Sequence, residues 1–107
     1  MSTIKRDRFL QLRGGRAYRV ELSCRACDTV LLQYQKDGDG QLKRCYLNRI
    51  IGPEVLLESG KFATTDKDLE LLQCNSCKAK IGIPITYYDG RLAYRLIPNT
   101  FKKRRMR

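Results

Sequence analysis

The chain has 107 residues, enough for one compact domain, and carries 22 lysines and arginines against 11 aspartates and glutamates, a formal net charge of +11. It contains five cysteines but no histidine and no tryptophan, which excludes His-based catalytic triads, HExxH proteases and zinc fingers with histidine ligands. A core of this size gives marginal stability, so we expect a metal or a disulfide to add to it.

The amino-terminal segment predicts a basic arm over residues 1–18. Residues 1–19 hold six basic side chains against one acidic side chain, and the six are Lys5, Arg6, Arg8, Arg13, Arg16 and Arg19. The segment lacks the apolar stretch of a signal peptide, and no apolar run approaches the ~20 residues that cross a bilayer. We therefore expect a cytoplasmic protein without a membrane partner, in which spaced cysteines bind metal before they form disulfides.

The first CxxC pair, Cys24 and Cys27, lies between segments typical of strands. Residues 19–23 are expected to lead into the pair, and residues 29–35 and 41–50 to follow it as two further strands. Between these two strands lies Asp39-Gly40. Asp-Gly between apolar runs is typical of β-hairpins because both residues tolerate the positive φ of a tight turn.

Residues 52–73 join this segment to a second one of the same design. Gly52-Pro53 and Ser59-Gly60 interrupt them as turn signals. Residues 54–58 fit either a short helix or a strand, and residues 68–73 predict a strand. No part of the chain has the length and periodicity of a long amphipathic helix, so the predicted fold class is mainly β.

The second CxxC pair repeats the first at an offset of 50 residues. Strands are predicted over residues 80–88 and 91–97, and Pro84, which lacks an N–H group, places the first of them at a sheet edge or a bulge. The matching positions are Cys24 and Cys74, Cys27 and Cys77, Leu22 and Leu72, Leu31 and Ile81, and Asp39-Gly40 and Asp89-Gly90. The sequence thus predicts an internal duplication of two antiparallel hairpin units, each with a CxxC knuckle.

The two knuckles together predict one zinc site with Cys24, Cys27, Cys74 and Cys77 as ligands, because four thiolates complete a tetrahedral shell. Two disulfides or redox pairs are the alternative, and an iron centre could use the same ligands. A shell closed by four sulfurs leaves no open position for a substrate, so the metal is predicted to be structural and the protein not an enzyme. Cys45 corresponds to Arg95 in the repeat and is predicted to be a strand residue without a ligand role.

The carboxyl-terminal segment, residues 102–107, predicts a second basic arm, and residues 19–101 are the zinc-binding β domain between the two arms. The basic residues of this tail are Lys102, Lys103, Arg104, Arg105 and Arg107. Such self-repelling arms should be disordered alone and could become ordered against a polyanion.

The second knuckle resembles a signature of Yippee-like proteins and the related cereblon-type domains. In that signature a CxxC pair is followed by three residues, an aliphatic residue and a glycine, and here the residues are Cys74-Asn-Ser-Cys77-Lys-Ala-Lys-Ile81-Gly82. The resemblance covers residues 22–97 and implies a β-tent, two antiparallel sheets pinned at one end by zinc on the four cysteines. The ligand pocket of cereblon-type domains is built from tryptophans, which this chain lacks. A zinc ribbon, in which two knuckled hairpins face each other, fits the same residues.

The charge distribution predicts a zinc-binding β protein that binds RNA through its arms, as a small component of the ribosome or another ribonucleoprotein. Arginine side chains suit phosphate geometry, and no motif for reading bases is present, so contacts should be led by shape and backbone. Double-stranded DNA is the less favoured nucleic acid. The alternative is a β-tent module that binds a protein or a small ligand on a concave aromatic sheet face.

Overall fold

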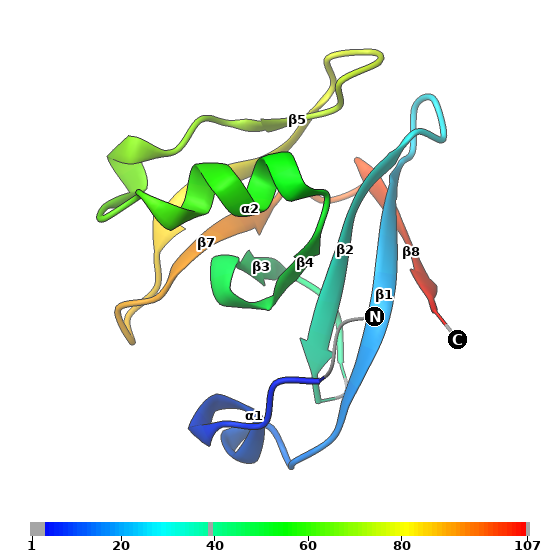
Figure 1. Cartoon of the computed structure of the whole chain (residues 1–107). Helices are drawn as coiled ribbons and strands as arrows, with labels where there is room; N and C mark the ends of the chain where they lie inside the picture. The colour runs from blue at the N-terminus through cyan, green and yellow to red at the C-terminus, as the bar shows by residue number, and fades with distance from the viewer. Residues whose placement is uncertain (1–3, 39, 107) are drawn as a thin grey trace.

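The computed structural model describes residues 4–38 and 40–106, which form two four-stranded antiparallel sheets (Figure 1). In sheet order, the first consists of β4 (Ile50–Gly52), β2 (Val30–Asp37), β1 (Ala17–Cys24) and β8 (Phe101–Arg105). The second consists of β3 (Arg44–Tyr46), β7 (Leu92–Leu96), β6 (Lys80–Thr86) and β5 (Leu72–Gln73). The predicted mainly β class is confirmed.

Short helices lie at the margins of the sheets. They are α1 (Arg8–Leu12), α2 (Glu54–Lys61) and the 3-10 helices η1 (Leu47–Arg49) and η2 (Asp66–Asp68). Leu56 and Leu57 of α2 pack against the core, so the segment that fitted either a helix or a strand is a helix. None of the helices in the described part of the chain is long and apolar enough to span a membrane.

The core lies between the two sheets and follows the alternation of the strands. Along β1, Val20, Leu22 and Cys24 are buried while the residues between them are partly exposed, as the two-residue period of a strand dictates. The second sheet contributes Ile81, Tyr94 and Leu96, among others, to the same cluster. Each fully buried aliphatic side chain stabilises the fold by about 1.5–3 kcal/mol.

Cys45 is part of this core and stands apart from the other four cysteines. It lies in β3 opposite Tyr94 of β7 and is completely buried. Burial raises the pKa of the Cys45 thiol well above its usual range, so the side chain stays a neutral apolar group. The prediction of a strand residue is confirmed.

The duplication is visible in the hairpins that carry the knuckles. The pairing of β1 with β2 shifts register between Leu22 and Ser23, and the pairing of β5 with β6 shifts between Leu72 and Gln73, the same two positions 50 residues later. The predicted pair of CxxC-knuckled antiparallel hairpins is therefore confirmed. At Pro84, β6 pairs with β7 alone among the described strands, because the pairing of β5 with β6 ends at Leu72 opposite Gly82. Pro84 thus occupies the predicted edge position.

The two copies differ after their second strand. In the second copy β6 and β7 pair directly, with Thr86 opposite Leu92 across the Asp89-Gly90 turn. In the first copy the hairpin predicted between residues 29–35 and 41–50 is wrong: β2 pairs with β1 and β4, and β3 joins β7 in the other sheet. Because the chain crosses from β2 in the first sheet to β3 in the second, Cys45 is buried between the sheets. Both edges of β2 are paired, one with β1 and the other with β4. Asp39 of the expected turn lies outside the described residues.

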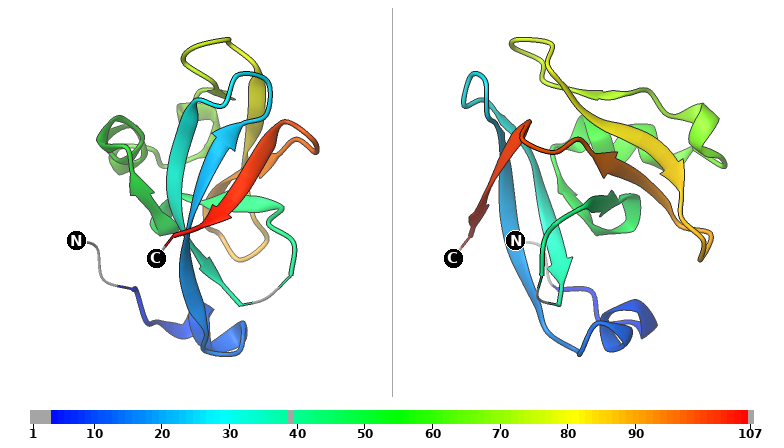
Figure 2. Two further views of the ribbon diagram at one scale, coloured as in Figure 1. Left: turned by 90° about the vertical axis from the view of Figure 1, so that its right-hand side faces the viewer. Right: turned by 180° about the vertical axis from the view of Figure 1, so that it is seen from behind.

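Both basic arms differ from the disorder expected of them. Five residues of β8 pair with β1 from Val20 to Cys24, so the backbone groups that face β1 are hydrogen bonded. Lys102 and Arg104 form ion pairs with Asp28 and Glu21, which offsets part of the repulsion between like charges. Figure 2 shows β8 lying beside β1, with the amino-terminal segment at the other end of β1.

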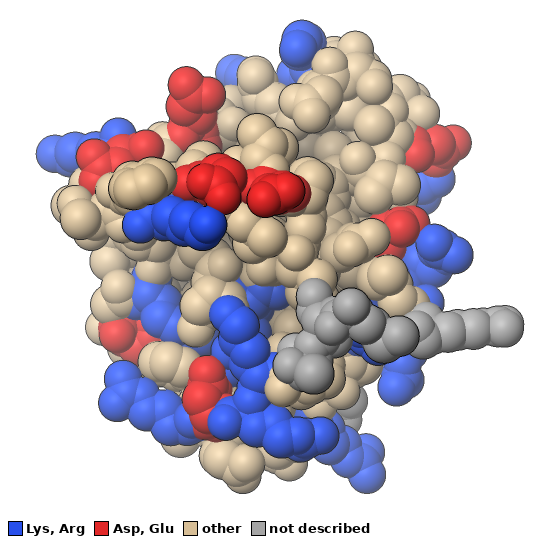
Figure 3. Space-filling view, in the orientation of Figure 1, with Lys and Arg blue, Asp and Glu red and all other residues tan. Residues whose placement is uncertain are grey.

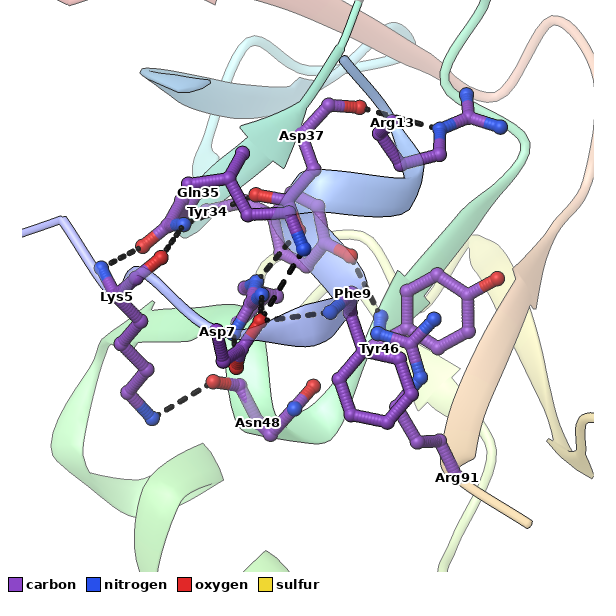
Figure 4. A network of polar contacts seen from close by, with 12 residues as sticks. Lys5, Asp7, Phe9, Arg13, Tyr34, Gln35, Asp37, Tyr46, Asn48 and Arg91 are labelled. Carbon is purple, nitrogen blue, oxygen red and sulfur yellow. Dashed lines mark hydrogen bonds and ion pairs between the residues drawn. The ribbon is translucent and has the colours of Figure 1, made fainter. Parts of the chain in front are cut away.

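The amino-terminal segment is attached through the buried Arg49, whose partners Asp7 and Asp37 are labelled in Figure 4. Asp7 caps α1 by accepting hydrogen bonds from the N–H groups of Phe9 and Leu10. The Arg49 side chain, 1% exposed, donates to Asp7 at 2.6 Å and to Asp37 at 2.8 Å. Gln35 accepts from the Lys5 N–H at 2.7 Å and donates to the Lys5 carbonyl at 2.9 Å. These bonds fix residues 5–7 against the end of β2.

We expect Gly38→Ala to destabilise the fold by about 2 kcal/mol, because the residue has φ +74° and an added Cβ would lie 2.7 Å from the Arg13 carbonyl oxygen. Gly14→Ala is the matched control, since Gly14 has φ +93° with no atom within 4 Å of the added Cβ. Chemical denaturation measures both variants. Equal losses would contradict the assigned close approach of the chain at Gly38.

Candidate metal centre

Each CxxC pair lies in a knuckle at the turn of a hairpin, and the two knuckles have the same backbone geometry. The Cys24 N–H donates to the Thr29 carbonyl at 2.8 Å, and the Cys74 N–H donates to the Ala79 carbonyl at 2.9 Å. Asp28 and Lys78, which are equivalent in the repeat, both have φ 65°. The shared positive φ closes each loop and directs both of its cysteines to one side.

The four sulfurs of the two knuckles come together. The turns that carry the knuckles, between β1 and β2 and between β5 and β6, lie at the same end of the molecule, at the top of Figure 1. All four Sγ atoms lie within 4.8 Å of one another. Two of the separations join different knuckles: 3.6 Å from Cys24 to Cys77 and 3.5 Å from Cys27 to Cys74. The cysteines are free thiols, so the alternative of a disulfide in each pair is not what the structure shows.

These separations suit a metal ion with four sulfur ligands. A tetrahedral shell with metal–sulfur distances of about 2.3 Å separates its sulfurs by about 3.8 Å. Cys24 and Cys74 are buried, while Cys27 and Cys77 are exposed, so the shell would face solvent on one side and the core on the other. The predicted ligand set is therefore within metal-binding distance, and a shell of four protein sulfurs is closed to substrates.

Backbone N–H groups within the loops stabilise negative charge on the sulfurs. Hydrogen bonds from Cys77 and Ser76 lower the pKa of Cys74 to about 6. The pKa of Cys77 is raised to about 11: a hydrogen bond from Ala79 lowers it, but the neighbouring Cys24, Cys27 and Cys74 thiols together with desolvation have the larger effect. Four thiolates at these distances repel one another, and a bound cation removes that repulsion.

A hydrogen-bond chain links the two knuckles beside the sulfurs. The Cys27 Sγ and the Thr29 hydroxyl are hydrogen bonded at 3.1 Å, and the Thr29 hydroxyl donates to the Ser76 hydroxyl at 3.0 Å. Groups that bond to metal ligands in this way orient those ligands. The sequence does not single out Thr29 or Ser76, whose only signal is that they lie within two residues of a cysteine.

The predicted nucleic-acid residues do not form one compact site. Those in the described part of the chain lie on the amino-terminal segment, at the start of β1 and along β8, and Arg107 lies outside the described residues. All are exposed except Arg19, which is partly buried. The exposed residues are Lys5, Arg6, Arg8, Arg13, Arg16, Lys102, Lys103, Arg104 and Arg105. β1 connects the two groups because it follows the first segment in the chain and pairs with β8.

Aromatic and basic side chains gather around one cleft of the surface, which the sequence did not indicate. A cleft of about 570 Å³ lies between α1, the end of β2, β3 and the turn between β6 and β7. Tyr87 and Tyr88 line it together with Arg44, Arg91 and other basic and aromatic residues. No short motif in the sequence marks this cleft, because its residues come from segments that are distant in the chain.

Comparisons with models of protein families, with curated proteins and with solved structures found no match for this chain. The structure itself defines a mainly β protein whose four knuckle cysteines lie within metal-binding distance. The likeness to Yippee-like and cereblon-type domains beyond these cysteines stays a prediction.

Proposed function

We propose that the chain is a non-catalytic zinc protein in which the metal joins the two knuckles and the basic segments bind RNA. Zinc is favoured because its structural sites are tetrahedral and commonly consist of four cysteines in CxxC pairs. The ion would link β1 and β2 of one sheet to β5 and β6 of the other at the point where the sulfurs meet. It would thereby fix the angle between the sheets.

The RNA-binding proposal is supported by the exposed basic residues on the amino-terminal segment and along β8. In Figure 3, lysine and arginine predominate over the lower half of the visible face, where the amino-terminal segment and α1 lie. On β8, Lys103 and Arg105 form no ion pair with any described residue, whereas Lys102 and Arg104 are paired with acids. Ordered cations that lack acidic partners bind phosphates with a smaller entropic cost than cations on a disordered arm.

We expect the double substitution Lys103→Gln and Arg105→Gln to lower the affinity for a labelled RNA hairpin with a long single-stranded loop roughly tenfold at low salt. Loss of two phosphate contacts should also reduce the steepness of the slope of log affinity against log salt concentration by about 1.4. Fluorescence anisotropy at several salt concentrations measures both quantities. A DNA duplex serves as the second probe and should bind more weakly than the RNA.

The matched control is the double substitution Lys67→Gln and Lys80→Gln, which removes two exposed cations from η2 and β6. This control should retain the wild-type affinity and salt dependence. Equal effects of the two double variants would contradict a specific role for β8, because any loss of net charge would then act alike. Co-sedimentation of the native protein with ribosomal particles, reversed by salt, tests membership of a ribonucleoprotein.

The alternative of a module that binds a small ligand or a protein is favoured by one observation, the cleft lined by aromatic residues. Such a module would keep its binding when the basic residues of β8 are neutralised. The same double variant therefore separates the two proposals.

A further inference from the structure

We propose that the cleft between α1, β3 and the β6–β7 turn binds an unpaired base of single-stranded RNA together with its phosphate. This proposal rests on the proposed RNA-binding function and gives it a specific contact site. The residues of the cleft that carry the argument are Phe9, Arg44, Tyr46, Tyr87, Tyr88 and Arg91. Its volume of about 570 Å³ lies in the range of ligand sites in proteins.

The walls of the cleft consist of aromatic rings alternating with guanidinium groups. The Arg91 guanidinium lies 3.8 Å from the ring centre of Phe9 and 3.7 Å from that of Tyr46, so it is held between two rings. Figure 4 shows Phe9, Tyr46 and Arg91 close together, with Asp7 nearby. Planar groups fixed in this way need little further ordering when a planar ligand binds.

Arg44 extends the same arrangement toward the turn. Its guanidinium lies 4.3 Å from the ring centre of Tyr87 and donates to the hydroxyl groups of Tyr46 at 3.2 Å and Tyr87 at 3.3 Å. No described acidic residue forms an ion pair with Arg44. Its positive charge is therefore compensated by tyrosine hydroxyls and ring faces alone, which suits it to receive a phosphate.

Tyr88 provides the exposed stacking surface. Its side chain is 90% exposed, and its ring lies 4.4 Å from that of Tyr87 with a tilt of 48°. Burying such a ring under a base removes apolar surface from water, and stacking on an aromatic side chain is how proteins hold the bases of single strands. A base on Tyr88 would lie next to Tyr87 and Arg44.

Charge favours an anionic ligand over a neutral one. Five lining residues are basic, Arg13, Lys36, Lys43, Arg44 and Arg91, against the two acidic residues Asp37 and Asp89. Both acids already form ion pairs, Asp37 with Arg49 and Asp89 with Arg91. An acidic peptide would match the charge but not the exposed ring, whereas a nucleotide offers both a phosphate and a flat aromatic face. The observations therefore favour RNA.

The position of the cleft connects it to the basic surface. Phe9, Leu12 and Arg13 of its wall belong to α1 and the residue after it, and the same segment continues through Arg16 into β1. A strand of RNA whose backbone follows the exposed Arg13 and Arg16, between α1 and β1, could place one base in the cleft without leaving the protein surface. A duplex keeps its bases stacked and paired and has no base to offer.

We expect Tyr88→Ala to lower the affinity for labelled oligouridine roughly tenfold and to leave the affinity for an RNA duplex and the salt dependence unchanged. Tyr88→Phe should retain binding because the ring is kept. Phe62→Ala is the matched control, since Phe62 is 83% exposed and lies outside the cleft. Thermal melting of each variant checks that the fold is preserved.

A second measurement reports on stacking directly. The chain contains no tryptophan, so Tyr88→Trp introduces one fluorophore at the cleft. Its emission should be quenched by oligouridine and not by the duplex or by oligoglutamate, which serves as the acidic peptide probe. Oligoglutamate that quenches the emission, or that competes equally with oligouridine, would overturn the assignment to RNA.

The outcomes separate this inference from the proposed function. If wild-type protein binds oligouridine with the expected salt dependence and Tyr88→Ala binds equally well, the cleft is not a base site although RNA binding stands. If wild-type protein binds neither oligouridine nor the duplex, both proposals are overturned. Loss of binding in Phe62→Ala equal to that in Tyr88→Ala would also overturn the cleft, because the effect would not be specific to it.

Discussion

Replacing Cys74 by serine should cause the chain to lose its metal and its folded structure together. Cys74 is buried and its Sγ lies 3.5 Å from that of Cys27 in the opposite knuckle, so its removal breaks the shell between the sheets. In small metal-binding domains the free energy of metal binding is part of the free energy of folding. Circular dichroism and metal analysis of the purified variant measure the two losses, and a strong chelator should reproduce them in the wild-type protein.

Cys45→Ala is the control for this prediction. It removes a thiol that is completely buried in β3 and is not among the four clustered sulfurs. We expect about 1–2 kcal/mol of destabilisation from the lost packing and full retention of the metal. A Cys45→Ala protein that binds no metal, or a Cys74→Ser protein that stays folded with its metal, would contradict the ligand assignment.

Arg49→Met should destabilise the fold by about 3 kcal/mol or more, because it removes the buried partner of two carboxylates and frees the amino-terminal segment. Asp37, whose side chain is 10% exposed, would be left next to apolar surface without its cation. Arg95→Met is the matched control, since Arg95 is exposed on β7, and it should change stability by less than about 0.5 kcal/mol. Chemical denaturation compares the two variants. If the two variants lose the same free energy of unfolding, the Arg49 network adds no more stability than the exposed Arg95 does.

The same network gives a pH dependence with a defined sign. Hydrogen bonds from the Arg49 side chain, opposed by desolvation, lower the pKa of Asp7 to about 2, below its value of about 3.9 in unfolded chains. The Asp7 contribution to stability is therefore fully present above pH 4 or so and is lost as pH falls toward about 2. Because the cysteines also become protonated in acid, the measurement is the difference between wild type and Asp7→Asn. An identical acid titration of stability in both proteins would contradict the assignment.

Local signals in the sequence predict the parts of this structure that local geometry controls. The spacing of Cys24, Cys27, Cys74 and Cys77 and the repeat at 50 residues indicate two knuckled hairpins, and the structure brings these sulfurs together. Isoleucines alternate with other residues from Ile81 onward, which predicts the strand β6, and Pro84 indicates that this part of β6 lies at a sheet edge. In each case the determining residues are neighbours in the chain.

The parts that sequence analysis missed depend on contacts between distant segments. β3 resembles the second strand of a hairpin, yet it joins β7, because the partner of a strand is decided by burial rather than by turn residues alone. β8 is composed of charged residues and still forms a strand because β1 has an edge available to it. The sequence around Arg49 gives no sign that its side chain joins two carboxylates, since Asp7 and Asp37 belong to other segments of the chain.

Metal analysis combined with X-ray absorption at the zinc edge shows whether the four sulfurs of the two knuckles share one zinc ion. We expect one zinc per chain, surrounded by four sulfur atoms at about 2.3 Å and by no nitrogen or oxygen ligand. Protein purified with its cysteines joined as disulfides, or with zinc bound to nitrogen or oxygen ligands, would contradict it.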